Sequence, residues 1–172
     1  MTPQSDYRFL RGVNYYPFPT DEARLRRELA FGRRVHLNSI RVWLSFREWQ
    51  RDPEGYVRRL VGSVRVAYDC GYTTMPILFN GNGENSASLP DEARPAMEDY
   101  VSAVVNALKD EPGLVMWDVM NEPLCCWWID GCANPGEKSG RIERVWELLR
   151  HFIPLVRALD PVNAVTVGYT TA

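Results

Sequence analysis

The sequence predicts an α/β fold in which strands and helices alternate and all strands lie parallel in one sheet. Five short apolar segments bounded by Gly, Pro or Asn have the length of buried strands, about 5–8 residues. The longer segments between them repeat apolar residues at three- and four-residue steps, as amphipathic helices do. Because crossovers between parallel strands are right-handed, this alternation implies a parallel βα repeat of about five strands and four helices.

The first half of the chain contains three of the predicted strands, at residues 9–16, 39–46 and 73–79. Thr20 is expected to cap the first helix, because two acidic residues follow it and suit the positive end of the helix dipole. Asp52 followed by Pro53 begins the second helix. Gly71 provides its stop signal.

The second half is organised around the apolar run of residues 114–123, which follows Pro112 and Gly113 and is the fourth predicted strand. Pro123 ends it, because proline has no N–H to give to the ladder. Pro95 starts the third helix. A long loop over residues 124–140 precedes a fourth helix over 141–159, which Pro154 is expected to kink, and a fifth strand over 164–168.

Composition excludes several classes of protein. The 172 residues, of which 45% are hydrophobic, predict a single domain over residues 1–172. A formal net charge of −2 gives no indication of a nucleic-acid partner. No apolar run approaches the roughly 18 residues of a membrane span. The polar start, without a signal-peptide core, predicts a cytoplasmic protein, although a secreted protein with a trimmed N-terminus would look the same.

The cysteines and glycines do not predict a cofactor. Cys70, Cys125, Cys126 and Cys132 form no Cys-x-x-Cys pair with a nearby His, so no metal site is expected. Free thiols are expected, with a disulfide from Cys132 to Cys125 or Cys126 as the alternative. A doubly wound nucleotide-binding fold is the competing architecture. No Gly-x-Gly-x-x-Gly or Walker loop follows a predicted strand to support it.

The end of the fourth strand is the candidate active site. Asn121 and Glu122 stand at the carboxyl end of a buried strand, which is where parallel α/β folds bind their ligands. A carboxyl group there, beside an amide and the nearby tryptophans, is a candidate general acid. The alternative is that Glu122 begins a solvated loop, as charged residues usually do.

The string Trp-Asp-Val-Met-Asn-Glu-Pro, from Trp117 to Pro123, resembles the fourth-strand motif of the clan A glycoside hydrolases, which include the family 5 cellulases and mannanases. The resemblance implies retaining hydrolysis of a β-linked glucan or mannan. Glu122 would then be the acid/base, and Asn121 would bind the sugar hydroxyl next to the reacting carbon. Arg41 matches the strand-two arginine that orients the nucleophile, with a purely structural ion pair as the alternative.

The same resemblance implies a set of substrate-binding residues on one face of the barrel. Asn14, Tyr15 and Tyr16 are similar to sugar-subsite residues at the end of strand one. The other residues expected around the site are Trp43, Asn80, Asn82, Glu84, Trp127 and Trp128. Core packing is the alternative for Trp43 and for one residue of the Trp127–Trp128 pair.

The chain departs from the family in lacking a position for the strand-seven nucleophile. Retention requires two carboxyl groups about 5–5.5 Å apart. Glu84, on the loop after strand three, is one local substitute. Asp118 is the other, but strict alternation would hold it on the same face as Glu122 about 13 Å away, too far to cooperate.

The length of the chain also predicts only part of a barrel. A (β/α)8 barrel typically needs about 250 residues, so we expect a partial barrel matching the first five units: a fragment, half of an assembly, or a relative that closes its sheet differently. An open fifth strand favours self-association or a complementing fragment that carries strands six to eight. The alternative function is an inactive carbohydrate-binding or structural remnant; the expected partner remains a β-linked oligo- or polysaccharide.

Overall fold

The computed structural model describes residues 6–81 and 86–169. The described residues form one sheet of parallel strands in the order β1-β2-β3-β4-β5. The strands are β1 Gly12–Tyr15, β2 Ser39–Trp43, β3 Thr73–Asn80, β4 Met116–Asn121 and β5 Ala164–Gly168. The predicted parallel βα repeat is therefore confirmed, and the fold is a partial (β/α)8 barrel.

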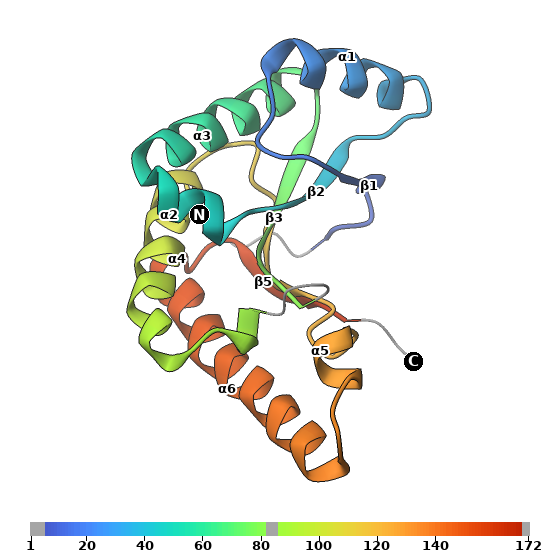
Figure 1. Cartoon of the computed structure of the whole chain (residues 1–172). Helices are drawn as coiled ribbons and strands as arrows, with labels where there is room; N and C mark the ends of the chain where they lie inside the picture. Colours follow the sequence, from blue (N-terminus) through green and yellow to red (C-terminus); the bar gives the residue numbers. More distant parts are fainter. Residues whose placement is uncertain (1–5, 82–85, 170–172) are drawn as a thin grey trace.

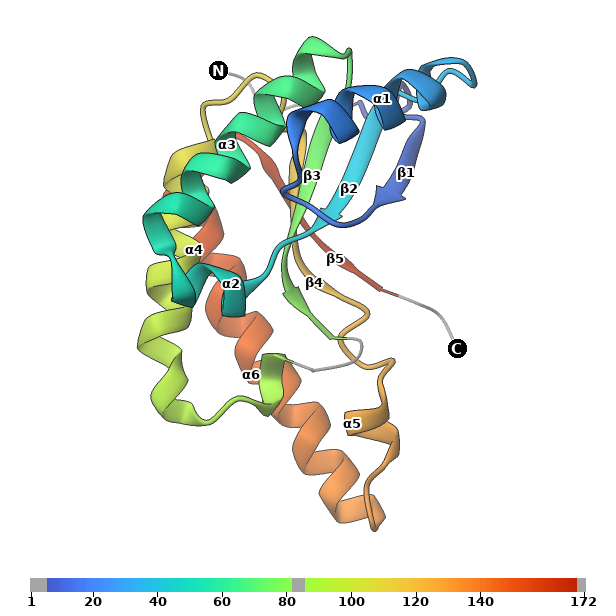
Figure 2. The same cartoon turned by 45° about the horizontal axis from the view of Figure 1, so that its top comes forward.

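Four long helices connect these strands, as predicted: α1 Glu22–Arg33, α3 Pro53–Asp69, α4 Arg94–Leu108 and α6 Pro135–Leu159. The shorter elements are α2 Phe46–Arg51, α5 Trp127–Asp130 and the 3-10 turns η1 Ser86–Ser88 and η2 Asp91–Ala93. Figures 1 and 2 show α3, α4 and α6 along one side of the sheet. The helices thus form the outer layer of a barrel wall.

The core lies between this helical layer and the sheet. Ile40 and Val42 of β2 are fully buried, and so are Leu60 and Val64 of α3; all four belong to one continuous cluster. Burying one such side chain contributes about 1.5–3 kcal/mol. The alternate residues of β2, including Arg41 and Trp43, are half-buried on the other face. Period-two alternation therefore leaves the barrel-interior face of β2 available for a site.

Several predicted boundaries are wrong, each for a local reason. Asp21 rather than Thr20 caps α1, because its carboxylate accepts the N–H of Arg24 at 2.8 Å. Strand β2 ends at Trp43, since Ser45 accepts the N–H of Glu48 at 3.1 Å and begins the unpredicted helix α2. Strand β1 begins at Gly12, and α6 starts at Pro135, where Asn134 provides the cap. Polar caps set the starts of the three helices.

An irregularity interrupts the pairing of β4 with β5. Asp118 is paired with Thr166 and Asn121 with Gly168, so β4 advances by three residues where β5 advances by two. The N–H of Met120 turns toward Oδ1 of Asp118, 3.1 Å away. The expectation that strict alternation runs from Asp118 to Glu122 is wrong, because the bulge brings Asn121 to the face of Asp118.

The two outer strands each have one partner in the described part of the chain: β1 pairs with β2, and β5 with β4. Val13 of β1 is 43% exposed. None of the four cysteines is joined in a disulfide. The helices that the structure describes include none long and apolar enough to span a bilayer, and the cytoplasmic location stays a prediction.

Candidate active site

Arg41 connects three strands at the open face of the sheet. Its Nη2 donates to Oδ2 of Asp118 at 2.6 Å and to Oδ1 of Asn121 at 2.8 Å. Its Nε reaches the same Asp118 oxygen at 3.0 Å, and its Nη1 reaches Oδ1 of Asn14 at 3.3 Å. The structure thus joins three residues predicted from the sequence, Asn14, Arg41 and Asn121, to a fourth through the Arg41 guanidinium.

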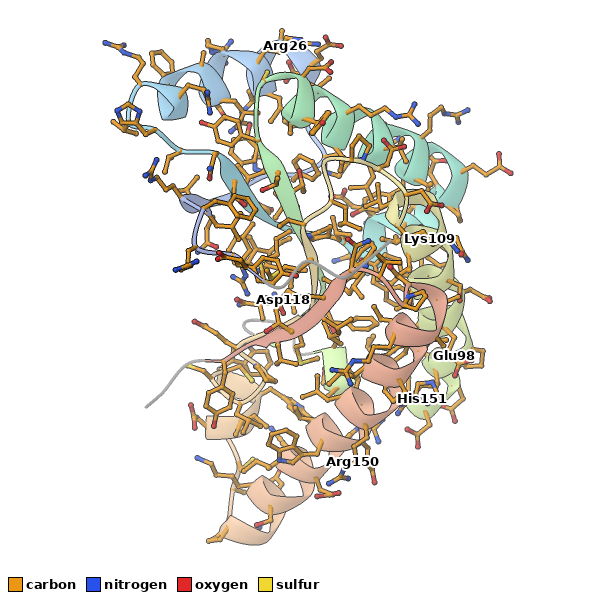
Figure 3. All side chains as sticks on the ribbon, turned by 180° about the vertical axis from the view of Figure 1, so that it is seen from behind. Arg26, Glu98, Lys109, Asp118, Arg150 and His151 are labelled. Carbon is orange, nitrogen blue, oxygen red and sulfur yellow. The ribbon has the colours of Figure 1, made fainter. Side chains whose placement is uncertain are left out.

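That fourth residue, Asp118, is a fully buried carboxylate. Its Oδ1 also accepts the N–H of Gly168 at 3.0 Å, and Figure 3 shows the side chain beside β5. Burial raises the pKa of Asp118, because it penalises the charged form, while the Arg41 guanidinium and the backbone N–H groups of Gly168 and Met120 oppose that rise. Arg41 is therefore the cation of a buried ion pair.

Glu122 follows β4 in an unusual backbone conformation. Its φ is 44°, and His36 is the other non-glycine residue with a positive φ in the described chain. Holding such a residue in the left-handed region costs on the order of 1–3 kcal/mol and is typical of functional sites. Its N–H donates to the carbonyl of Gly168 at 2.6 Å, and its own carbonyl accepts the N–H of Cys125 at 3.1 Å. The half-buried side chain thus stands at the carboxyl end of β4, as predicted.

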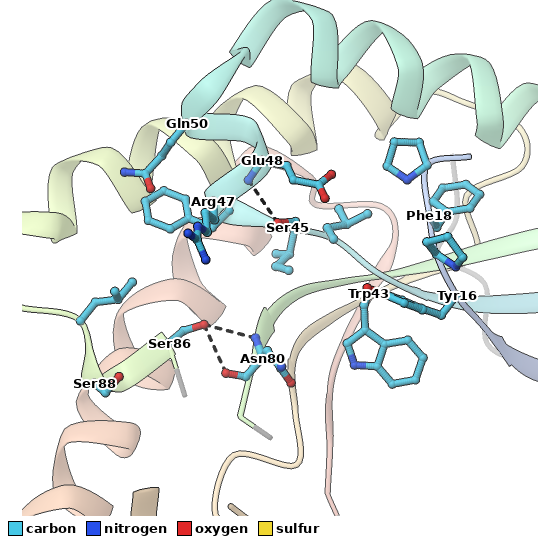
Figure 4. A pocket seen from close by; sticks show the side chains of 16 residues that line it. Tyr16, Phe18, Trp43, Ser45, Arg47, Glu48, Gln50, Asn80, Ser86 and Ser88 are labelled. Atoms are coloured by element: carbon cyan, nitrogen blue, oxygen red, sulfur yellow. Dashed lines mark hydrogen bonds between the residues drawn. The ribbon is translucent and has the colours of Figure 1, made fainter. Parts of the chain in front are cut away.

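A groove of about 730 Å³ lies at the carboxyl ends of β2 and β3 (Figure 4). Its aromatic lining comes from Tyr16, Phe18, Trp43 and Phe46. Its polar and charged lining comes from Ser45, Arg47, Glu48, Gln50, Asn80, Ser86 and Ser88. Flat apolar rings next to hydrogen-bonding groups are the composition expected of a pocket for a polar ligand with an apolar face.

The groove and the Arg41 cluster meet at Trp43. The guanidinium carbon of Arg41 lies 5.3 Å from the centre of the Trp43 ring, in a cation–π arrangement. Within the described part of the chain, the groove lining does not include Asn121 or Glu122. Trp43 is therefore the element shared by the candidate catalytic residues and the candidate binding surface.

The far side of the groove is held by α6. Ser86 makes two 3.2 Å hydrogen bonds to the backbone of Asn80. Arg144 of α6 donates to the carbonyls of Ala87 at 2.7 Å and Leu89 at 2.6 Å, and to Asp91 at 2.9 Å. One guanidinium thereby fixes residues 87–91.

Other predicted site residues lie elsewhere. Tyr15 turns toward the helices, where its hydroxyl donates to Glu28 at 2.7 Å; burial, followed by Glu28, raises its pKa. Trp127 is 65% exposed on α5. The guanidinium carbon of Arg141 lies 5.2 Å from the centre of the half-buried Trp128 ring. Asn82 and Glu84 fall outside the described residues.

Sequence reasoning missed the groove residues of α2, although a signal for that helix was present. Ser45 followed three residues later by Glu48 is the spacing of a capping box. Arg47, Glu48 and Gln50 enter the groove because the helix begins there. The described residues contain no group of three His, Cys, Asp or Glu side chains that could hold a metal ion.

Comparison with solved structures identifies the class of fold. An endo-β-1,4-mannanase from Thermotoga petrophila superposes with a TM-score of 0.71 at 19% identity, covering 96% of this chain and 43% of the mannanase. An endo-1,4-β-mannanase from Rhizomucor miehei gives 0.70 at 15% identity, with 98% and 59% covered. An endoglucanase from Pseudomonas stutzeri gives 0.55 at 17% identity, with 91% and 50% covered.

The chain therefore has the fold of the clan A glycoside hydrolases, of which mannanases and endoglucanases are examples, and the resemblance predicted from the sequence is confirmed for the fold. It spans about half the length of the structures it matches. No family model and no curated protein matches the sequence.

Proposed function

We propose that this chain carries the acid/base half of a retaining glycoside hydrolase site for β-linked glucan or mannan, within one partial-barrel domain over residues 1–172. Glu122 is the proton donor, and Asn121 binds the sugar hydroxyl beside the reacting carbon. The observation that carries the proposal is the arrangement of Glu122 after β4, next to the cluster of Arg41, Asp118 and Asn121. The fold shared with mannanases and an endoglucanase supports the substrate class.

The groove supplies the path for the polysaccharide. The apolar face of a pyranose ring stacks on a flat aromatic side chain, and Trp43 offers one next to Arg41. Asn80 and Ser86 provide hydrogen-bonding groups for sugar hydroxyls on the opposite wall. Trp127 is a further exposed ring beyond β4. In this arrangement a β-linked oligosaccharide lies in the groove and extends toward Glu122.

The second carboxylate of a retaining site must lie about 5–5.5 Å from the acid. Asp118 is an unsuitable nucleophile, because its Oδ2 accepts two hydrogen bonds from Arg41 and its Oδ1 accepts two from backbone N–H groups. We therefore assign the nucleophile to a complementing segment. That segment, or a second copy of the chain, would pair with the open edges of β1 and β5.

A second candidate function is a carbohydrate-binding or structural remnant without catalysis. The observation favouring it is the ion pair itself: Arg41, expected to orient a nucleophile, is instead 2.6 Å from buried Asp118. In such a remnant the groove would keep its affinity for sugar. Glu122 would have no role in bond cleavage.

Calorimetric titration with manno- and cello-oligosaccharides tests binding. We expect Trp43→Ala and Asn121→Ala to weaken the affinity, by about 1–2 kcal/mol for loss of the aromatic anchor. Trp127→Ala and Trp128→Ala test the rim beyond β4. Trp146→Ala, a partly exposed tryptophan on the outer helix α6, is the matched control and should bind as the unaltered chain does. Absence of binding at millimolar sugar would reject the hydrolase and the carbohydrate-binding remnant, and would leave the structural remnant.

Hydrolysis of an aryl β-mannoside or β-glucoside distinguishes the hydrolase from the remnant. Activity that Glu122→Gln abolishes, and that the control Glu147→Gln on α6 leaves intact, supports the hydrolase. Sugar binding without turnover, even after a segment that carries the remaining strands is added, supports the remnant. Turnover unaffected by Glu122→Gln would remove Glu122 from the proton-donor role.

A further inference from the structure

Two glycines, at the carboxyl ends of the strands on either side of β4, lie against the main chain around Glu122 or against the Arg41–Asp118 ion pair. Gly81 follows β3 directly, and Gly168 is the last residue of β5. We infer that Gly81 and Gly168 are positioning residues, which hold the Asn121–Glu122 peptide and thereby aim the Glu122 carboxyl group. The inference rests on the proposed role of Glu122 as the proton donor.

Gly81 lies against the segment on the β3 side. Its N–H donates to the carbonyl of Asn121 at 2.8 Å. A Cβ at this position would lie 2.4 Å from the Asn121 oxygen, 2.5 Å from the Glu122 oxygen and 2.6 Å from Cα of Pro123. All three are main-chain atoms, which cannot move aside as a side-chain end can. Any side chain at position 81 would therefore displace the Glu122 segment.

Gly168 lies against the same segment on the β5 side. Its carbonyl accepts the N–H of Glu122 at 2.6 Å, and its own N–H donates to Oδ1 of Asp118 at 3.0 Å. A Cβ on Gly168 would lie 2.3 Å from Nη2 of Arg41 and 2.8 Å from Oδ2 of Asp118. The Arg41–Asp118 ion pair occupies the space that a side chain at position 168 would take.

The requirement at both positions is space, not backbone freedom. Among the described glycines, Gly71 is the one with φ in the left-handed region. The residue with a left-handed φ at this site is Glu122, at 44°. Such a conformation persists where surrounding contacts over-determine it. The hydrogen bonds at Gly81 and Gly168 hold the two ends of the Asn121–Glu122 peptide, so the glycines maintain this conformation.

Positioning of this kind has a specific kinetic consequence. A misplacement of about 1 Å in a catalytic group costs on the order of 10²-fold in rate. The groove that binds the sugar lies along Trp43 and Asn80, and its lining includes neither glycine. Replacing either glycine should therefore lower kcat and leave KM unchanged.

The test combines amide hydrogen exchange with kinetics on the 172-residue chain. The variants are Gly168→Ala and Gly81→Ala, and Gly62→Ala in α3 is the matched control, because no atom lies within 4 Å of its added Cβ. We expect the Glu122 amide to exchange on the order of tenfold faster in Gly168→Ala, as when one hydrogen bond is lost. The amide of Val42 in β2 should keep its rate.

With an aryl β-glycoside, we expect Gly168→Ala to lose about 10²-fold in kcat at an unchanged KM, and Gly62→Ala to behave as the unaltered chain. Gly81→Ala contacts main chain and is the variant more at risk of not folding, so Gly168→Ala carries the decision. A folded Gly168→Ala with unaltered Glu122 exchange overturns the inference. So does faster exchange with unchanged kcat. If the unaltered chain has no turnover, as expected where the nucleophile lies on a complementing segment, the exchange measurement alone decides whether the glycines hold Glu122.

Discussion

The guanidinium of Arg41 and the carboxylate of Asp118 meet at 2.6 Å across an intervening strand. Arg41 belongs to β2 and Asp118 to β4, with β3 between them. In the sheet register, Arg41 is paired with Met75 and Asp118 with Ile77, so the two partners of the ion pair are offset by two residues along β3. This contact joins β2, whose carboxyl end borders the groove, to β4, which Glu122 follows.

Replacing Arg41 by Met should destabilise the fold at neutral pH. Removing one partner of a buried pair costs about 3–5 kcal/mol, and we expect the lower end because the Arg41 side chain is 21% exposed. Loss of the cation leaves burial to raise the pKa of Asp118 further above its unfolded value. The folded variant then binds the Asp118 proton more tightly than the unfolded chain. The cost of the substitution is therefore smallest below about pH 4 and grows as the pH rises toward 7.

Urea unfolding of both chains between pH 3.5 and 7 measures this difference. The control is Arg150→Met, which removes a pair whose side chains are 63% and 56% exposed and should cost less than about 1 kcal/mol. Equal costs for the two variants at neutral pH would mean that the Arg41–Asp118 pair contributes no more than a surface pair.

Asp160 is expected to stabilise the junction between α6 and β5. Its buried carboxylate accepts the Trp117 indole N–H at 2.8 Å and the backbone N–H groups of Val162 and Asn163 at 3.1 and 3.0 Å. Burial acts to raise its pKa, but these donors, together with the Asn163 amide, lower it on balance. Asp160→Asn should therefore cost about 1.5–3 kcal/mol at pH 7, the range for hydrogen bonds to a charged group.

The sign of the pH dependence follows from the lowered pKa. A carboxyl with a depressed folded pKa contributes stability above its unfolded value of about 3.9, and loses that contribution as the pH falls through the folded pKa. The unfolding free energies of Asp160→Asn and the unaltered chain should thus converge in acid. Asp69→Asn, on the exposed end of α3, is the control. A difference that stays constant down to pH 2 would contradict the assignment.

Arg144→Ala should loosen the far wall of the groove without unfolding the chain. The substitution leaves the carbonyls of Ala87 and Leu89 without their guanidinium donor. We expect a stability loss of about 1–2 kcal/mol and faster amide exchange in residues 86–91. Weaker oligosaccharide binding should accompany it. Arg157→Ala, an exposed arginine of the same helix, is the control; equal exchange in the two variants would show that Arg144 does not hold this wall.

The open strand edges predict self-association. Within the described residues β1 and β5 each pair on one side, and each buried polar group left without a partner costs about 1–3 kcal/mol. Sedimentation of the 172-residue chain should therefore detect species larger than 19.8 kDa, unless a segment carrying the remaining strands is added. A monodisperse, cooperatively melting monomer would contradict this expectation.

The sequence alone determined the order and type of the long elements. Apolar runs ending at Pro or Gly mark the strands, and three- and four-residue periodicity marks the helices, because both signals are local. For the same reason the position of Asn121 and Glu122 at the carboxyl end of the fourth strand followed from Pro123. The short helices α2 and α5 were not predicted, because four to six residues carry too little periodicity.

The tertiary structure decided how the candidate site is assembled. The bulge between Asp118 and Asn121 appears in the pairing of β4 with β5, since a register shift is a property of two strands. Tyr15 faces Glu28 of α1, although its neighbour Asn14 faces Arg41. The space left by Gly81 and Gly168 is defined by atoms from β2 and from the segment around Glu122. These contacts join residues far apart in the chain, and packing between elements, not local preference, sets them.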